Sequence, residues 1–135
     1  MCSSDLLLAT LVVPGVVEAV TRSRAVRIFV CNAMTERGET DGYGVAEHLR
    51  ALDAHGLPPE ALDYVVVSTT PIPSKIRARY AAEGARPVDP DFVLPGEPPA
   101  IVRADLLEPG PVVRHGADKL GPILCDLVAK RLEWV

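Results

Sequence analysis

A short polar stretch between residues 32 and 41 concentrates the side chains best suited to bind a ligand. It offers amide, hydroxyl and carboxylate groups, carried by Asn32, Thr35, Glu39, Thr40 and Asp41. Carboxylate oxygens bind Mg²⁺ and accept hydrogen bonds from ribose hydroxyls, so Glu39 and Asp41 could serve either ligand. Asp41 alternatively caps the helix that follows, because an aspartate just before a helix satisfies its free N–H groups.

The elements around this stretch should hold it at the edge of a sheet. Before it, Val26–Val30 is an apolar, β-branched run of the kind that forms a buried strand. After it, Val45, Leu49 and Leu52 share one face of a predicted helix. A strand, a polar loop and a helix make half of a βαβ unit, and ligands of open parallel sheets bind beyond the carboxyl ends of the strands. The pattern therefore predicts a ligand-binding loop.

The same order of elements recurs further along the chain. Asp63–Ser68 is a second apolar strand, and after a small polar loop Pro73–Glu83 is a predicted helix. Ala100–Leu107 is a third predicted strand, and Ala117–Leu132 is a final amphipathic helix. This alternation predicts an α/β fold with a doubly wound, mostly parallel, Rossmann-like sheet.

Two side chains of the second unit each allow a functional and a structural interpretation. The hydroxyl of Thr70 follows the second strand, where it could contact a ligand or cap the entry to the next helix. The ring of Tyr80 could stack on a nucleobase or hydrogen-bond a sugar, or it could simply cover the sheet.

Arg114 and His115 form a second candidate binding element. The planar guanidinium of an arginine donates two parallel hydrogen bonds to phosphate oxygens and keeps its charge at all relevant pH values, so Arg114 suits a diphosphate. His115 adds a donor that titrates near neutrality. The alternative for Arg114 is an ion pair on the protein surface.

The rest of the chain contains no recognisable catalytic or metal centre. The three histidines lack metal-ligand spacing, and no serine lies in the Gly-x-Ser-x-Gly context of a hydrolase. A formal net charge of −4 without a basic patch argues against nucleic acid as a partner. The apolar runs fall short of the roughly 20 residues that a membrane span requires, and three scattered cysteines fit a reducing compartment. We therefore expect a cytoplasmic protein without membrane insertion.

One stretch points to a family. Residues 31–49, CNAMTERGETDGYGVAEHL, resemble the C-N-x-M-T-x-x-G-E-T-D-x-Y-x-x-x-D-H signature of gluconeogenesis factors of the YvcK type. These are UDP-N-acetylglucosamine-binding members of the 2-phospho-L-lactate transferase-like, or CofD-like, superfamily. Ala33 replaces a common valine and Glu47 replaces a common aspartate. The Y-x-x-E-G-A segment that begins at Tyr80 also fits the resemblance.

The resemblance implies both a function and a placement of the ligand. It implies a regulatory protein that binds UDP-N-acetylglucosamine and supports gluconeogenic carbon use, envelope synthesis and cell shape. The loop Asn32–Asp41 would line the sugar or the uridine, Arg114 would lie near the diphosphate, and Tyr80 near the base. In relatives an acidic residue follows the Arg-His pair, where this chain has Gly116.

Two other functions stay open. A phospholactyl transferase or related phosphotransferase of the same superfamily would need Mg²⁺ and a deazaflavin-type acceptor. A scaffold that associates with further copies, as a homo-oligomer, would use the apolar stretch Leu6–Val13. The signature favours the binding branch, so we expect a binding protein rather than an enzyme.

The resemblance covers residues 7–135 and corresponds to the C-terminal part of a CofD-like domain. Residues 1–6, Met-Cys-Ser-Ser-Asp-Leu, look foreign to it. The string GTG TGC TCT TCC GAT CT, with GTG as start codon, would encode them and matches the end of a common sequencing adapter. We expect these residues to be non-native and a glycine-rich first strand and loop to be missing. The alternative is an ordinary N-terminus.

Overall fold

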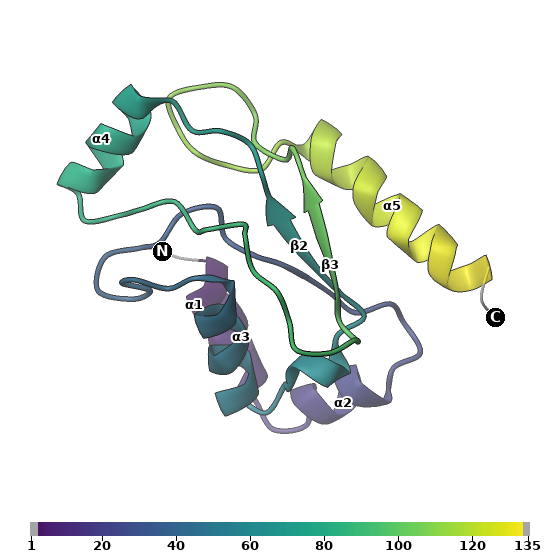
Figure 1. Cartoon of the computed structure of the whole chain (residues 1–135). Helices are drawn as coiled ribbons and strands as arrows, with labels where there is room; N and C mark the ends of the chain where they lie inside the picture. The colour runs from purple at the N-terminus through teal and green to yellow at the C-terminus, as the bar shows by residue number, and fades with distance from the viewer. Residues whose placement is uncertain (1–2, 134–135) are drawn as a thin grey trace.

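The computed structural model describes residues 3–133, with side chains from residue 6 onward. Its centre is a parallel three-stranded sheet in the order β1 (Ile28–Val30), β2 (Tyr64–Ser68) and β3 (Ala100–Ala104) (Figure 1). In the register of the sheet, Val66 of β2 aligns with Val30 on one side and with Val102 on the other. The three middle residues of β2, Val65–Val67, are apolar because they are buried on both faces of the sheet.

The helices of the described residues are α1 (Ser3–Leu11), α2 (Val16–Arg22), α3 (Val45–Ala54), the short 3-10 helix η1 (Pro59–Ala61), α4 (Ser74–Ala82) and α5 (Ala117–Glu133). The predicted apolar face of α3 is buried, since Val45, Leu49 and Leu52 all belong to the core. Gly56 follows the end of α3 with a φ of 93°, a left-handed conformation that glycine adopts without strain.

Different helices cover the two faces of the sheet. Successive residues of a strand point to opposite faces, so Val65 and Val67 face away from Val66. Val65 and Val67 pack in a core cluster with Leu49 of α3 and with α1. Val66 packs instead with Leu127 of α5, which crosses the other side of the sheet in Figure 1. Helices on both faces confirm the predicted doubly wound α/β fold.

Helix α4 departs from the prediction that it would repeat the first unit. None of its residues is buried, and in Figure 1 it stands away from the sheet. Ile76 and Tyr80 are its two large apolar or aromatic side chains, and this narrow stripe provides too little apolar surface to hold a helix against a sheet. The interpretation of Tyr80 as a cover for the sheet is therefore wrong.

The strands are shorter than predicted, although their positions are right. β1 loses Val26 and Arg27, because the backbone N–H of Arg27 donates to the Asp63 carboxylate at 2.8 Å instead of joining a ladder. β3 ends at Ala104, where the chain turns into the loop that carries the second candidate element.

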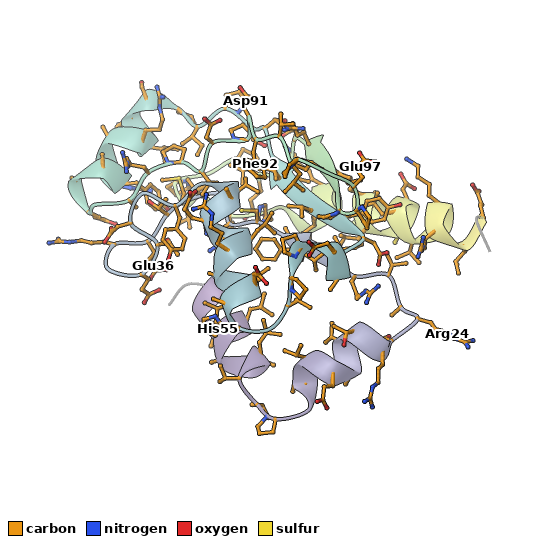
Figure 2. The ribbon with its side chains drawn as sticks, turned by 60° about the horizontal axis from the view of Figure 1, so that its bottom comes forward. Arg24, Glu36, His55, Asp91, Phe92 and Glu97 are labelled. Carbon is orange, nitrogen blue, oxygen red and sulfur yellow. The ribbon has the colours of Figure 1, made fainter. Side chains whose placement is uncertain are left out.

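The proline-rich connection from α4 to β3 has no regular strand or helix, as its composition predicts. It is nevertheless packed, since Val88 is buried and Phe92 and Leu94 lie against the core cluster of α3. In the view of Figure 2, Phe92 lies near the centre of the molecule and Asp91 at its margin.

The apolar stretch Leu6–Val13 is divided by the fold. It is helical up to Leu11, which is buried in the core, while Leu6, Val12 and Val13 are exposed. The prediction that residues 1–6 are non-native rests partly on residues 1 and 2, which lie outside the described residues, and it stays a prediction. Among residues 3–133, no helix combines the length and the apolar character needed to cross a bilayer.

Candidate functional site

A cavity of about 630 Å³ lies beyond the carboxyl end of β1. It is formed by the loop after β1, the C-terminal end of α4 and a segment just before α5. Its lining comprises Asn32, Ala33, Met34, Thr35, Glu36, Arg37, Tyr80, Glu83, Ala85, Val113, Arg114 and His115. Its volume falls within the range of roughly 300–1,000 Å³ that is usual for small-molecule sites.

The cavity brings together side chains that the sequence analysis selected from three distant segments. These are Asn32 and Thr35 from the first loop, Tyr80 from α4, and Arg114 and His115 from the last segment. The remaining candidates, Glu39, Thr40 and Asp41, belong to the same loop but do not line this cavity.

Thr35 fixes the loop to the chain that follows α4. Its backbone N–H donates to the Arg86 carbonyl at 2.7 Å, and its Oγ1 accepts from the Arg86 N–H at 2.8 Å. Met34 pairs with Pro87 in an antiparallel bridge next to these bonds. The Thr35 side chain is 5% exposed, so its hydroxyl holds one wall of the cavity in place.

Thr40 and Asp41 stabilise the far part of the loop. The Thr40 hydroxyl is buried and accepts from the Glu36 N–H at 2.7 Å, and an oxygen of Asp41 accepts from the Gly38 N–H at 2.8 Å. The alternative that Asp41 caps α3 is wrong, because the first turn of that helix is closed by Glu47, which accepts from the Gly44 N–H at 2.8 Å. That backbone hydrogen bond also lowers the pKa of Glu47.

The groups that could bind Mg²⁺, Glu39 and Asp41, belong to the far part of the same loop. One oxygen of Asp41 already accepts a backbone hydrogen bond. No three His, Cys, Asp or Glu side chains of the described residues gather closely enough to hold a metal ion. Binding of Mg²⁺ by Glu39 and Asp41 therefore stays a prediction.

Arg114 and His115 are held beside the end of β3 by a short antiparallel pairing. His115 bridges Leu107, and the Glu108 N–H donates to the Arg114 carbonyl at 3.2 Å. The Arg114 side chain is 70% exposed, and its guanidinium forms an ion pair with Glu108. In this structure Arg114 is thus a surface ion-pair partner whose cation also lines the cavity.

His115 is half-buried. Its Nε2 atom is buried without a hydrogen-bond partner among the described residues. Burial penalises the charged imidazolium and lowers the pKa of His115. A neutral imidazole with a free nitrogen can accept or donate one hydrogen bond to a bound ligand.

The cavity also contains charged groups that the sequence analysis did not select. Arg37 and Glu83 line it from the first loop and from the end of α4. The stem of Arg37 passes so close to Gly84 that a Cβ there would lie 2.8 Å from its Cδ. Gly84 also has a φ of 83°, a left-handed conformation that glycine adopts without strain, whereas the contact with Arg37 involves only an exposed side chain. Arg37 occupies an unspecified position of the signature, so only its place within the polar loop could have drawn attention to it.

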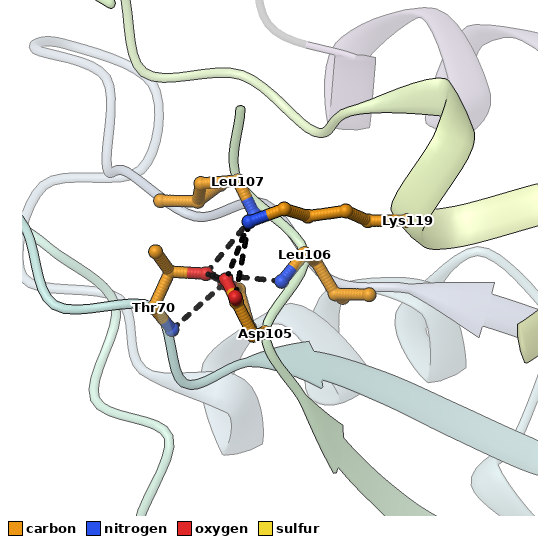
Figure 3. A network of polar contacts seen from close by, with 6 residues as sticks. Thr70, Asp105, Leu106, Leu107 and Lys119 are labelled. Atoms are coloured by element: carbon orange, nitrogen blue, oxygen red, sulfur yellow. Dashed lines mark hydrogen bonds and ion pairs between the residues drawn. The ribbon is translucent and has the colours of Figure 1, made fainter. Parts of the chain in front are cut away.

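A second polar network joins the carboxyl ends of β2 and β3 (Figure 3). The Thr70 hydroxyl donates to the Asp105 carboxylate at 2.5 Å and accepts from the N–H groups of Leu106 and Leu107, each at 3.0 Å. Lys119 of α5 donates to both carboxylate oxygens of Asp105 at 3.0 Å. The Thr70 hydroxyl, and after it Lys119, lower the pKa of Asp105.

This network corrects the interpretation of Thr70 as a helix cap. The residue that precedes α4 is Pro73, and no side chain caps that helix. Thr70 instead connects two strand ends to the start of α5. Thr70 and Asp105 each follow the carboxyl end of a strand, and only the folded structure shows that they bond to each other.

The fold and the cavity together define a class of protein. A parallel α/β sheet with a polar cavity beyond a strand's carboxyl end is typical of Rossmann-like ligand-binding domains. Residues 6–107 match the sequence profile of the family described as 2-phospho-L-lactate transferase CofD. The chain therefore belongs to the CofD family.

Within this family, the chain is similar in sequence to proteins named gluconeogenesis factor. The chain is 35% identical over 125 residues to the gluconeogenesis factor of Halalkalibacterium halodurans, covering 89% of this chain and 38% of that protein. It is 34% identical over 124 residues to the gluconeogenesis factor of Bacillus subtilis, covering 90% of this chain and 39% of that protein. The chain thus spans less than two fifths of the length of these curated relatives.

A solved structure shows the same fold. The crystal structure of a member of the UPF0052 family from Bacillus halodurans superposes with a TM-score of 0.72 at 33% sequence identity. The match covers 84% of this chain and 36% of that one. The described sheet and helices are therefore part of a larger CofD-like fold.

Proposed function

We propose that this chain is part of a cytoplasmic regulatory protein that binds UDP-N-acetylglucosamine and supports gluconeogenic carbon use, envelope synthesis and cell shape. The proposal is supported by the similarity to proteins named gluconeogenesis factor. Its main structural support is that Asn32, Tyr80 and Arg114, from three distant segments, line one cavity of suitable volume.

Each part of the ligand has a chemically matched group in the cavity. The diphosphate suits the guanidinium of Arg114, with Arg37 as a second cation nearby on the lining. The amide of Asn32 can both donate and accept, as a uracil edge or a sugar hydroxyl requires. His115 also lines the cavity, although its unpartnered Nε2 is buried, so a ligand would reach that nitrogen only after the surrounding groups move.

Isothermal titration calorimetry tests this proposal directly. UDP-N-acetylglucosamine, UDP and N-acetylglucosamine are titrated in turn into the protein. If both halves of the ligand contact the cavity, the intact nucleotide sugar binds more tightly than UDP, and the free sugar binds most weakly. Equal affinity for UDP and UDP-N-acetylglucosamine would mean that the sugar does not contribute to binding. An absence of heat with all three compounds would contradict the proposed function.

A second candidate function is phosphotransfer, which the name of the matching family favours. A phospholactyl transferase would move a phospholactyl group from a nucleotide-activated donor to a deazaflavin-type acceptor in the presence of Mg²⁺. The discriminating observation is conversion of that acceptor into a phosphorylated product, separated by chromatography and detected by the absorbance of the deazaflavin ring. Turnover would favour the transferase, and binding of the nucleotide sugar without turnover favours the regulatory protein.

Self-association is a third proposal, and it concerns the N-terminal apolar residues. Leu6, Val12 and Val13 are each more than half exposed, which leaves apolar surface that a second copy could cover. Sedimentation velocity of the protein and of its Val13→Asp variant tests this. A shift from dimer to monomer in the variant supports association, and a monomeric parent protein contradicts it.

A further inference from the structure

Helix α4 is attached to the rest of the molecule through two adjacent residues near its end. No residue of the helix is buried, so packing against the sheet does not fix its position. Its described side-chain bonds go to the segment that precedes Arg114. These bonds come from Arg79 and Tyr80.

Both side chains form hydrogen bonds with the backbone of the segment that precedes Arg114. The Val113 N–H donates to the Tyr80 hydroxyl at 3.0 Å, and the Arg79 guanidinium donates to the Pro111 carbonyl. The Arg79 guanidinium also lies over the Tyr80 ring, 5.2 Å from its centroid, so the two side chains support each other. We call this pair the Arg79–Tyr80 latch.

The latch holds residues 109–113, which form few other hydrogen bonds on the side that faces α4. These residues include Pro109, Gly110 and Pro111, and Val112 is exposed. On the other side the Arg114 carbonyl accepts from the Glu108 N–H at 3.2 Å. The bonded amide of Val113 is directly before Arg114, so the latch fixes the chain one residue away from the proposed phosphate-binding cation.

We propose that Arg79 and Tyr80 are positioning residues that hold Arg114 at the cavity. This inference rests on the proposed function, because it assigns the latch the task of presenting Arg114 to an anionic ligand. It also revises the role expected of Tyr80: its hydroxyl bonds the protein backbone, and Arg79 covers part of its ring. Tyr80 thus lines the cavity and also acts on the ligand through Arg114.

The test compares backbone amide exchange in the ligand-free protein by NMR. Tyr80→Phe keeps the ring but removes the acceptor of the Val113 N–H, so exchange at Val113 should accelerate about three- to tenfold. Arg79→Ala should act in the same direction, and Arg79→Lys should restore slow exchange because an ammonium can donate to the Pro111 carbonyl. Arg77→Ala is the matched control, since it removes the same charge from the same helix.

The amides of Val65–Val67 in the central strand report whether a variant has lost global stability. Their exchange should be unchanged in every variant. Acceleration at Val113 together with equal acceleration in this strand would mean general loosening and would overturn the positioning role. Unchanged exchange at Val113 in Tyr80→Phe and Arg79→Ala would overturn the latch itself.

A second measurement connects the latch to the ligand. The affinity for UDP-N-acetylglucosamine should fall about three- to tenfold in Tyr80→Phe and stay unchanged in Arg77→Ala. Faster exchange with unchanged affinity would overturn the positioning role. A wild-type protein that does not bind the nucleotide sugar contradicts the proposed function, whereas the exchange comparison still decides whether the latch exists.

Discussion

At the scale of single residues, the charge on Arg114 is shared between a protein partner and the cavity. Its ion pair with Glu108 is exposed, and such pairs contribute roughly 0.2–1 kcal/mol. A phosphate that binds Arg114 must displace this carboxylate or bind beside it. Glu108 therefore opposes the binding of an anion.

We expect Glu108→Gln to bind UDP-N-acetylglucosamine about 1.5- to 5-fold more tightly, the factor that corresponds to an exposed ion pair. Calorimetry at low salt measures it. The gain should shrink at high ionic strength, which screens exposed charges. Glu18→Gln, an exposed residue of α2, is the control for net charge. Weaker binding by Glu108→Gln would show that the carboxylate contributes to the ligand site.

His115 should make the stability of the fold depend on pH. Burial holds its pKa in the folded protein below the unfolded value of 6.5. Between these two pKa values the unfolded chain binds more protons, so the free energy of unfolding decreases as the pH falls through 6.5. Urea unfolding at several pH values measures this slope. His115→Gln should reduce it, and an unchanged slope in that variant would contradict this role of His115.

Some residue roles could be predicted from the sequence and others could not. The polar character of the loop, and the suitability of Arg114 for a phosphate, follow from residue types alone. The sequence could not predict which side chains of the loop stabilise the loop itself. Thr35, Thr40 and Asp41 do so by accepting from backbone N–H groups that come close only after folding. The Tyr80–Val113 bond likewise depends on where an unpacked helix lies.

At the scale of elements, two kinds of connection hold the edge of the sheet where the site lies. The antiparallel pairing of Met34 with Pro87 joins the first loop to the chain after α4. The network of Thr70, Asp105 and Lys119 joins β2, β3 and α5. The apolar periodicity predicted β2, α3 and α5 well, because β2 and α3 bury a strong apolar pattern and α5 packs Leu127 against the sheet. It predicted the docking of α4 wrongly, because that helix has too few apolar residues to pack.

Thr70→Val should lower the free energy of unfolding by about 1–3 kcal/mol, because the N–H groups of Leu106 and Leu107 lose their acceptor. Urea denaturation measures the change. Thr69→Val is a matched control at an exposed neighbour, and Thr70→Ser should recover most of the stability because it restores the hydroxyl. Equal stability of the Thr70→Val variant and the parent protein would mean that the network does not hold the strand ends together.

At the scale of the whole molecule, the chain corresponds to part of a longer α/β protein. Its three-stranded sheet carries helices on both faces. The matched part of the chain covers 36% of the solved structure. The family and the fold class could be predicted from the signature in residues 31–49. The cavity could not, because it is built by three segments whose approach depends on the whole tertiary structure.

The central claim is that Arg114 contributes a phosphate-binding cation to this cavity, and one titration tests it most directly. UDP-N-acetylglucosamine is titrated by calorimetry into the wild type, into Arg114→Ala and into Arg24→Ala. Arg24 is an exposed arginine that Figure 2 places far from Glu36 of the cavity loop. The loss of hydrogen bonds to a charged group, about 1.5–3 kcal/mol, predicts about 10- to 150-fold weaker binding by Arg114→Ala and unchanged binding by Arg24→Ala. Wild-type affinity in Arg114→Ala would contradict the account.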